Sequence, residues 1–151
     1  MKRQVSLILP NIRSCHNVGA MFRTADAFGI EKLYLVGYTA HPPKVQIDKV
    51  SLGAEKWIPW EGREDIFELL SELKENGYQI IALEKTPESE DIRNVQFGEK
   101  VALIVGNEVD GVTEDILQKV DTVIHIPMCG KKESLNVSIA TGIALYMVSG
   151  I

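Results

Sequence analysis

The sequence predicts an α/β fold in which a mostly parallel sheet carries helices on both faces. Short segments rich in Leu, Ile and Val alternate along the chain with longer segments whose apolar residues recur every three or four positions. The short segments are apolar throughout, which is typical of strands that are covered on both sides in a parallel sheet. With 151 residues, of which 45% are hydrophobic, we expect one domain over 1–151.

The first half of the chain begins with an apolar strand and continues as an amphipathic helix. Asn17 is a favourable N-cap for that helix, and Gly29 is a favourable terminator. A later stretch has leucines at helical spacing, a row of glutamates on its other face and Gly77 at its end. The elements expected here are strands at Gln4–Leu9, Lys32–Val36 and Lys56–Trp60, and helices at Asn17–Phe28, Val45–Ser51 and Arg63–Asn76.

The second half contains three more apolar strands, a charged loop and two helices. Thr113 is expected to cap a short helix, because acidic residues follow in its first turn. The last helix is apolar almost all round, which indicates burial on more than one side. The elements expected here are strands at Gln79–Leu83, Val101–Val105 and Thr122–Ile126, a loop at Glu84–Val95, and helices at Thr113–Val120 and Asn136–Val148.

Composition excludes several classes of protein. No apolar run approaches the roughly 20 residues of a membrane-spanning helix, and the apolar start is too short for a signal peptide. Cys15 and Cys129 do not make a disulfide framework, so we expect a cytoplasmic protein. The net charge of −5 argues mildly against nucleic-acid binding, but residues 1–30 carry a local charge of +3 and residues 61–91 carry −7. An acidic face and a mildly basic site are therefore compatible.

Common catalytic and cofactor motifs are absent. The sequence contains neither G-x-G-x-x-G nor G-x-S-x-G. Gly106 and Gly111 have the spacing of a phosphate-binding loop, but Val112 and Thr113 stand where Lys and Ser or Thr are required. The three histidines and two cysteines show no metal-ligand spacing, so no metal site is expected.

Three short runs carry the functional signal. The first, from Asn17 to Gly29, reads Asn-Val-Gly-Ala-Met-Phe-Arg-Thr-Ala-Asp-Ala-Phe-Gly. The second contains Gly-Asn-Glu-x-x-Gly-Val from Gly106, and the third reads Ile-Pro-Met-x-Gly-x-x-x-Ser-Leu-Asn-Val-Ser-x-Ala from Ile126. The last two follow apolar strands and are rich in Gly and uncharged polar residues. Such loops at the carboxyl ends of parallel strands build small-molecule sites from backbone groups.

In order and spacing, the three runs resemble the signature motifs of the SpoU/TrmH family, and the resemblance covers nearly the whole chain. That family comprises S-adenosylmethionine-dependent RNA 2′-O-ribose methyltransferases of the SPOUT fold. The resemblance implies a deep trefoil knot near the C-terminus, which general rules of chain topology would disfavour. It also implies S-adenosyl-L-methionine as the cofactor.

The resemblance assigns roles to residues at matching positions. The residues expected to act in catalysis are Arg23, Asn17, Glu108, Ser134 and Asn136. The residues expected to contact the cofactor are Leu83, Glu84, Gly106, Asn107, Glu108, Ile126, Pro127, Met128, Leu135, Asn136 and Ala140. The residues expected to contact RNA are Arg13, His16, Arg23, Lys131 and Lys132.

Arg23 has the most defined expected role. In the family the matching arginine enters the active site, in dimers from the partner subunit. Because a guanidinium stays protonated in proteins, we expect it to stabilise the 2′-alkoxide or to hold the target phosphate rather than to act as a base. Without the motifs, Arg23 reads as a surface arginine, the loop glycines read as turn residues, and Ser134 reads as a helix cap.

The sequence therefore predicts an enzyme that methylates a ribose 2′-hydroxyl of tRNA or rRNA, as a homodimer built largely on the last helix and the first. Two alternatives stay open: a catalytically silent RNA-binding SPOUT protein, and a SPOUT methyltransferase that acts on a base. The chain starts at its first strand and stops just after its last helix, so we expect the catalytic domain only. Target choice is then expected to depend on surface loops, the second subunit or an accessory protein, and the small size favours tRNA.

Overall fold

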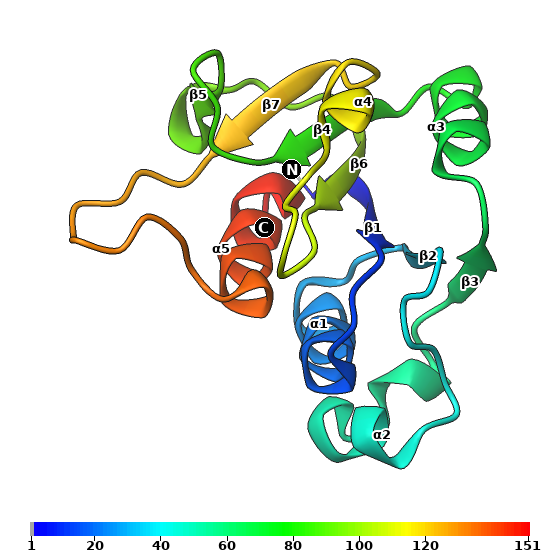
Figure 1. Ribbon diagram of the computed structural model, residues 1–151. Helices are drawn as coiled ribbons and strands as arrows, with labels where there is room; N and C mark the ends of the chain where they lie inside the picture. The colour runs from blue at the N-terminus through cyan, green and yellow to red at the C-terminus, as the bar shows by residue number, and fades with distance from the viewer. Residues whose placement is uncertain (1) are drawn as a thin grey trace.

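The computed structural model describes residues 2–151 and is built around a parallel sheet (Figure 1). The strands are β1 (Gln4–Pro10), β2 (Lys32–Val36), β3 (Trp60–Arg63), β4 (Gln79–Leu83), β5 (Glu90–Asp91), β6 (Lys100–Val105) and β7 (Thr122–His125). They form one sheet in the order β3-β2-β1-β6-β4-β7-β5, and each neighbouring pair is parallel. The predicted parallel sheet is confirmed, and the knot implied by the resemblance stays a prediction.

Helices cover both faces of this sheet. They are α1 (Cys15–Phe28), α2 (Val45–Ser51), α3 (Ile66–Glu75), α4 (Glu114–Leu117) and α5 (Val137–Ser149), with short 3₁₀ turns η1 (Ala54–Lys56) and η2 (Ile92–Asn94). The side chains of α1, α2 and α5 pack in one buried cluster on one face, and those of α3 and α4 pack in another on the opposite face. Figure 1 shows these two groups of helices on either side of the sheet. The molecule is therefore a three-layer α/β/α arrangement, as predicted.

Strand β1 shows why its sequence is apolar at every position. Leu7 and Leu9 point into the cluster beneath α1 and α5, whereas Ile8 between them points into the cluster beneath α3. All three side chains are fully buried, because alternate residues of a strand face opposite sides of the sheet and both sides are covered here.

Helix α1 begins earlier than the sequence predicted, and the predicted cap is wrong. The N-cap is Ser14, whose hydroxyl accepts a hydrogen bond from the backbone N–H of Asn17 at 3.1 Å. Asn17 itself lies in the first turn and is buried, so its side chain is available for a different contact. The end of the helix is as predicted, since Gly29 adopts a left-handed conformation with φ of 65°.

The strand predicted at Lys56–Trp60 is also wrong. Residues Ala54–Lys56 form η1, and β3 starts only at Trp60, where it pairs with β2. Arg63, which was predicted to open a helix, ends β3, and Asp65 caps α3. Residues 60–63 carry no apolar pattern, but pairing with β2 extends the sheet into them, because tertiary pairing overrides local propensity.

Three general properties concern the residues that the structure describes. None of their helices is long and apolar enough to cross a membrane. Both cysteines are free, with Cys15 half-buried and Cys129 exposed. Among residues 2–151, no group of His, Cys, Asp and Glu side chains is arranged to hold a metal ion.

Candidate functional site

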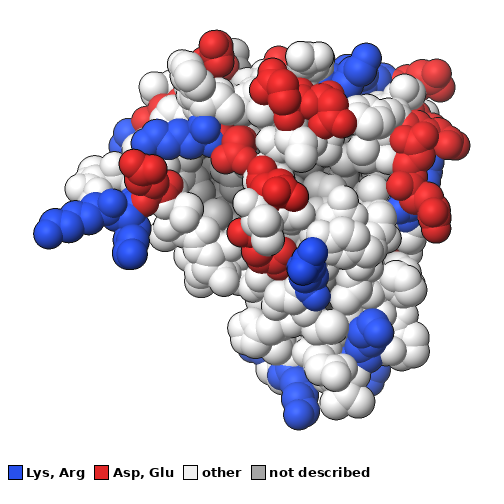
Figure 2. Space-filling view, viewed as in Figure 1, with Lys and Arg blue, Asp and Glu red and all other residues white. Residues whose placement is uncertain are grey.

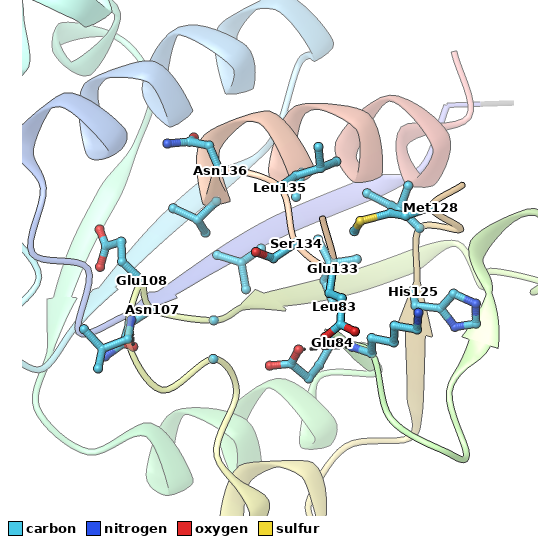
Figure 3. Close-up of a pocket in the computed structure, with 18 residues that line it drawn as sticks. Leu83, Glu84, Asn107, Glu108, His125, Met128, Glu133, Ser134, Leu135 and Asn136 are labelled. Atoms are coloured by element: carbon cyan, nitrogen blue, oxygen red, sulfur yellow. Dashed lines mark hydrogen bonds between the residues drawn. The ribbon is translucent and has the colours of Figure 1, made fainter. Parts of the chain in front are cut away.

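A cavity of about 420 Å³ opens at the carboxyl ends of β4, β6 and β7, beside the start of α5 (Figure 3). This volume lies in the range of small-molecule sites. Asn107 and Glu108 lie at one end of the cavity, and His125 and Met128 lie at the other (Figure 3). The lining residues are Leu83, Glu84, Lys85, Val105, Gly106, Asn107, Glu108, Val109, Gly111, His125, Ile126, Met128, Glu133, Ser134, Leu135, Asn136, Val137 and Ala140.

The residues predicted to contact a cofactor all line this cavity except Pro127, which is exposed. Ser134, predicted as catalytic, lines it as well. The sequence reasoning missed Lys85, His125 and Glu133, whose side chains border the same space. Each is the immediate sequence neighbour of a predicted residue, so adjacency in the loop was the signal that pointed to them.

The loop after β6 is folded tightly on itself. Gly111 has a φ of 64°, and a Cβ added to Gly106 would lie 2.5 Å from the carbonyl carbon of Gly111, so that only glycine fits. Glu84, at the end of β4, fixes the loop from the side, because its carboxylate accepts a hydrogen bond from the backbone N–H of Val112 at 2.8 Å. Glu84 therefore both lines the cavity and holds the wall opposite.

Asn107 shapes the turn that follows β6. Its side-chain oxygen accepts hydrogen bonds from the backbone N–H groups of Val109 and Asp110 at 2.9 and 2.6 Å. Its backbone carbonyl accepts one from the N–H of Gly111 at 3.2 Å. An asparagine side chain that bonds to its own backbone two residues on is a standard turn former. Asn107 thus fixes the backbone that carries Glu108.

Three motif residues that are distant in sequence meet in one chain of hydrogen bonds. The amide nitrogen of Asn136 donates to the side-chain oxygen of Asn17 at 3.4 Å, and the amide nitrogen of Asn17 donates to Oε1 of Glu108 at 3.1 Å. Asn17 is only 5% exposed, so both ends of its amide are used inside the protein. This chain, which we call the amide relay, joins the first turn of α1, the loop after β6 and the start of α5.

Glu108 receives further hydrogen bonds at the end of the relay. The backbone N–H groups of Arg13 and Ser14 donate to its carboxylate at 3.4 and 3.3 Å. Burial opposes ionisation of Glu108, but hydrogen bonds from its own backbone, from Asn17 and from these two N–H groups outweigh it. They hold the pKa of Glu108 below the usual value for a glutamate. Glu108 is therefore an anion at neutral pH.

Asn136 has a second role at the start of α5. Its side-chain oxygen accepts hydrogen bonds from the backbone N–H groups of Ser138 and Ile139 at 2.8 and 3.3 Å, which makes Asn136 the N-cap of that helix. The alternative reading of Ser134 as the cap is wrong. Ser134 instead lies in the exposed loop before the helix, where it lines the cavity.

Arg23 does not reach this cavity within the chain. It is exposed on α1, and its side chain makes no hydrogen bond or ion pair with the rest of residues 2–151. The next residue, Thr24, faces Gly142 of α5, since a Cβ added to Gly142 would lie 3.7 Å from its methyl group. Arg23 points about 100° around the helix axis from Thr24. It lies one turn beyond Gly19, whose added Cβ would meet Ile47 and Val50 of α2, so it lies outside the contact between α1 and α5 and away from the amide relay.

The residues predicted to contact RNA lie on the surface in two places. Arg13 and His16 are exposed around the start of α1, and Lys131 and Lys132 are exposed in the long loop between β7 and α5. That loop protrudes at the left of Figure 1, and Figure 2 shows basic side chains at its tip. Basic side chains also lie around α1 and α2, whereas acidic side chains gather around α3 (Figure 2).

Helix α5 carries an apolar face that the chain leaves uncovered. Leu145 and Val148 are buried against the sheet and α1, and Tyr146 meets Phe28 of α1 edge to face at 5.6 Å. The exposed residues on the outer side, with their exposed fractions, are Ile139 (55%), Ile143 (41%), Tyr146 (54%) and Met147 (38%). We call these four residues the α5 apolar face.

Comparison with known proteins gives matches over almost the whole chain. A family model described as the SpoU rRNA Methylase family matches residues 4–146. A tRNA (guanosine(18)-2′-O)-methyltransferase of Aquifex aeolicus is 41% identical over 148 residues, which are 96% of this chain and 69% of that protein. A tRNA (guanosine(18)-2′-O)-methyltransferase of Thermus thermophilus is 33% identical over 142 residues, which are 94% of this chain and 72% of that protein.

A solved structure extends the similarity to the fold. An AdoMet-bound rRNA methyltransferase from Sinorhizobium meliloti superimposes with a TM-score of 0.90 at 28% identity. The match covers 98% of this chain and 56% of that one, so the chain spans little more than half the length of this structural relative.

Proposed function

The chain belongs to the SpoU rRNA methylase family, and from that premise we propose that it is an S-adenosylmethionine-dependent enzyme that methylates a ribose 2′-hydroxyl of RNA. The observation that carries the proposal is the amide relay. It begins at Asn136 and ends at Glu108, and both residues line the cavity. A small-molecule cavity is thus bordered by side chains in fixed orientation, as a transfer reaction between two aligned groups requires.

The lining residues fit S-adenosylmethionine. Leu83, Ile126 and Leu135 supply apolar walls for a purine ring, and the close packing of Gly106 on Gly111 gives the loop after β6 the shape of a rigid cradle. When bound, the cofactor supplies an electrophilic methyl group on a positively charged sulfur. Carboxylates at Glu84, Glu108 and Glu133 border the cavity and complement a cation there.

The residues of the relay orient the acceptor side of the reaction. A ribose hydroxyl is a weak acid, so the site must hold its oxygen in line and stabilise the developing alkoxide. Glu108 is an anion and cannot stabilise an alkoxide. It instead anchors Asn17 and the backbone before α1, while Ser134 lines the cavity where the ribose would enter and Asn136 holds the start of α5 against the relay.

We assign the positive charge for the alkoxide to Arg23 of a second subunit. None of Asn17, Glu108, Ser134 and Asn136 is cationic, Lys85 is the one lysine or arginine among the described residues that line the cavity, and Arg23 is exposed on α1 outside that lining. The α5 apolar face is the kind of surface that a two-fold dimer covers. In such a homodimer each Arg23 serves the site of the other copy, holding the target phosphate or the 2′-oxygen by charge-assisted hydrogen bonds.

The proposed RNA contacts are Arg13 and His16 near the relay and Lys131 and Lys132 on the protruding loop. The proposed place of the reaction is the cytoplasm, where the RNA is found. Four such side chains give modest, salt-dependent binding, so target choice also draws on the second subunit or an accessory protein. The relatives from Aquifex aeolicus and Thermus thermophilus are named for tRNA and the one from Sinorhizobium meliloti for rRNA, and the RNA test therefore includes both classes.

The test is methyl transfer to RNA from cells that lack the gene. Purified protein is incubated with labelled S-adenosylmethionine and with separate tRNA and rRNA fractions, and the RNA is digested to nucleosides and analysed by mass spectrometry. We expect a 2′-O-methylnucleoside in one fraction, and its loss with Asn136→Ala. A base-methylated nucleoside would establish the base-directed alternative, and RNA binding without any transfer would establish the silent one.

A further inference from the structure

An exposed tyrosine stands beside the amide relay and has no role in the chemistry described so far. Tyr38 follows β2 directly after Gly37, which has a φ of 65°, and 55% of its surface is exposed. Exposure of one aromatic side chain is common, but Tyr38 lies in a loop at the mouth of the candidate site, where side chains often contact the substrate.

The ring is held from three sides. The backbone N–H of Tyr38 donates to the side-chain oxygen of Asn11 at 3.1 Å, which fixes the backbone behind the ring. Arg13 donates from Nε to the Tyr38 hydroxyl at 3.5 Å, and its guanidinium carbon lies 5.7 Å from the ring centroid. The side-chain amide of Asn107 also donates to the hydroxyl, at 3.5 Å. Tyr38 is therefore an oriented side chain, despite its exposure.

These contacts tie the ring to the acceptor end of the cavity. Asn107 lines the cavity and precedes Glu108, and the backbone N–H of Arg13 donates to the Glu108 carboxylate. The loops after β1, β2 and β6 thus converge on one point, with the relay on one side and Tyr38 on the other. Val109, on the same loop as Asn107, is 74% exposed and adds a second apolar side chain to the mouth.

We propose that Tyr38 and Arg13 form a stacking platform for the base of the nucleotide whose ribose is methylated. An RNA base that is taken out of its stack is commonly received by an aromatic ring or an arginine plane, and here both lie together beside the acceptor site. Stacking on a ring tolerates any base, so the platform sets where the ribose lies without reading sequence. The inference rests on the proposed function and names the group that positions its substrate.

The test compares three variants in methyl transfer with the RNA fraction that the wild type methylates. Tyr38→Ala removes the ring, and we expect KM for RNA to rise roughly five-fold to a hundred-fold, with cofactor affinity unchanged. Tyr38→Phe keeps the ring and loses only the two long hydrogen bonds to its hydroxyl, so it should stay within about three-fold of wild type. Trp57→Ala is the matched control, since Trp57 is 58% exposed but lies directly after η1 and outside the cavity lining.

A second measurement separates this inference from the proposed function. Binding of a short single-stranded oligoribonucleotide that carries the fluorescent base 2-aminopurine is followed by fluorescence quenching, which requires no transfer. We expect quenching with wild type and with Tyr38→Phe, and little with Tyr38→Ala. Equal quenching and equal KM for Tyr38→Ala would overturn the platform while leaving an active enzyme intact. An inactive wild type that still shows ring-dependent quenching would instead refute the transfer reaction.

Discussion

Asn17 and Arg23 belong to the same motif and the same helix, yet they differ in burial and in side-chain hydrogen bonds. Asn17 is 5% exposed, and both ends of its amide are bonded to other motif residues. The side chain of Arg23 is exposed and forms no hydrogen bond or ion pair within residues 2–151. One residue of the motif is therefore fixed by contacts within the chain, whereas the other is left free for a contact outside it. Under the proposed function, Asn17 belongs to the part of the site that one chain forms, and Arg23 belongs to the part that a second subunit would complete.

The strongest test of this comparison is complementation between two inactive variants. Arg23→Ala should lower methyl transfer by roughly 10²–10³-fold with cofactor binding nearly intact, and Arg23→Lys should rescue little. Asn136→Ala should lose cofactor binding and turnover together. If Arg23 crosses to the second subunit, mixed dimers of the two variants carry one intact site each and regain activity.

The two variants are co-expressed with different tags, and the doubly tagged species is purified and assayed. A mixed dimer as inactive as its parents would show that both residues serve the same subunit. Arg93→Ala is the control for removing an exposed arginine. Arg93 pairs with Asp91 and lies outside the cavity lining, so its loss should leave methyl transfer unchanged.

The second test concerns the surface that would bring Arg23 to its partner. Ile143→Glu places a carboxylate in the α5 apolar face, and we expect the protein to become monomeric and to lose transfer at least ten-fold while still binding cofactor. Light scattering and calorimetric titration with S-adenosylhomocysteine provide the two readings. Phe67→Glu, which changes an exposed apolar residue on α3, is the control and should leave the mass unchanged. A wild type that is monomeric at micromolar concentration would remove the dimer and the crossing arginine together.

The third test sharpens the claim that the cofactor side is complete within one chain. Gly106→Ala forces a Cβ to within 2.5 Å of Gly111 backbone, so the loop must open, and cofactor affinity should fall about ten-fold or more. Gly130→Ala is the matched control, because nothing lies within 4 Å of an added Cβ there. Equal affinities for both variants would mean that the loop after β6 does not shape the cofactor site.

The fourth test measures the gain in stability from the cofactor itself. S-adenosylmethionine at about 100 times its dissociation constant should stabilise the fold by roughly 2.7 kcal/mol, which corresponds to a rise in Tm of about 5–10 °C for a chain of this size. The same rise is expected for Arg23→Ala and Ile143→Glu, because neither touches the cavity lining. A melting curve that saturating ligand does not move would contradict the cofactor site.

The smallest expected effect is the pH dependence of the relay. The pKa of Glu108 is lower in the folded chain than its ordinary value, so its contribution to stability is complete above the ordinary glutamate pKa and is lost as pH falls through the lowered value. The difference in Tm between wild type and Glu108→Gln should therefore be constant above about pH 6 and shrink below about pH 4. A difference that grows on acidification would contradict the stabilised anion.

Most of the strands could be predicted from the sequence, because a strand that is buried on both faces is a continuous run of apolar residues. The strands β2 and β4 have the predicted bounds, since their apolar runs end at charged or Gly-containing loops. β3 was misplaced because its residues, from Trp60 to Arg63, are only partly buried and carry no apolar pattern. These residues form a strand because they pair with β2. A short stretch of sequence around residues 60–63 gives no information about that pairing, because β2 lies more than twenty residues earlier in the chain.

The candidate site was predictable to a similar extent and for a similar reason. Gly106 and Gly111 predict a tight loop at the end of a strand, so the wall of the cavity that the loop after β6 forms could be predicted from the sequence. The amide relay did not, because the Asn136–Asn17 contact spans 119 positions and depends on Ser14 having taken over the capping of α1. Tyr38 was missed for the same cause: its partners Arg13 and Asn107 come from two other loops.

The central position of β6 in the sheet has a consequence for folding during synthesis. Among the described strands, β1, β2 and β3 lie on one side of β6, and β4, β7 and β5 lie on the other. When residues 1–99 of the chain have been synthesised, β1, β2 and β3 can pair with one another, but β4 has no partner that joins it to them. The two parts of the sheet are joined only when residues 100–105 form β6 between β1 and β4. The relay closes later still, with residue 136. The cavity is therefore complete only after residues 136–140 have been made, and a nascent chain exposes the strand edges that β6 will occupy until residues 100–105 are in place.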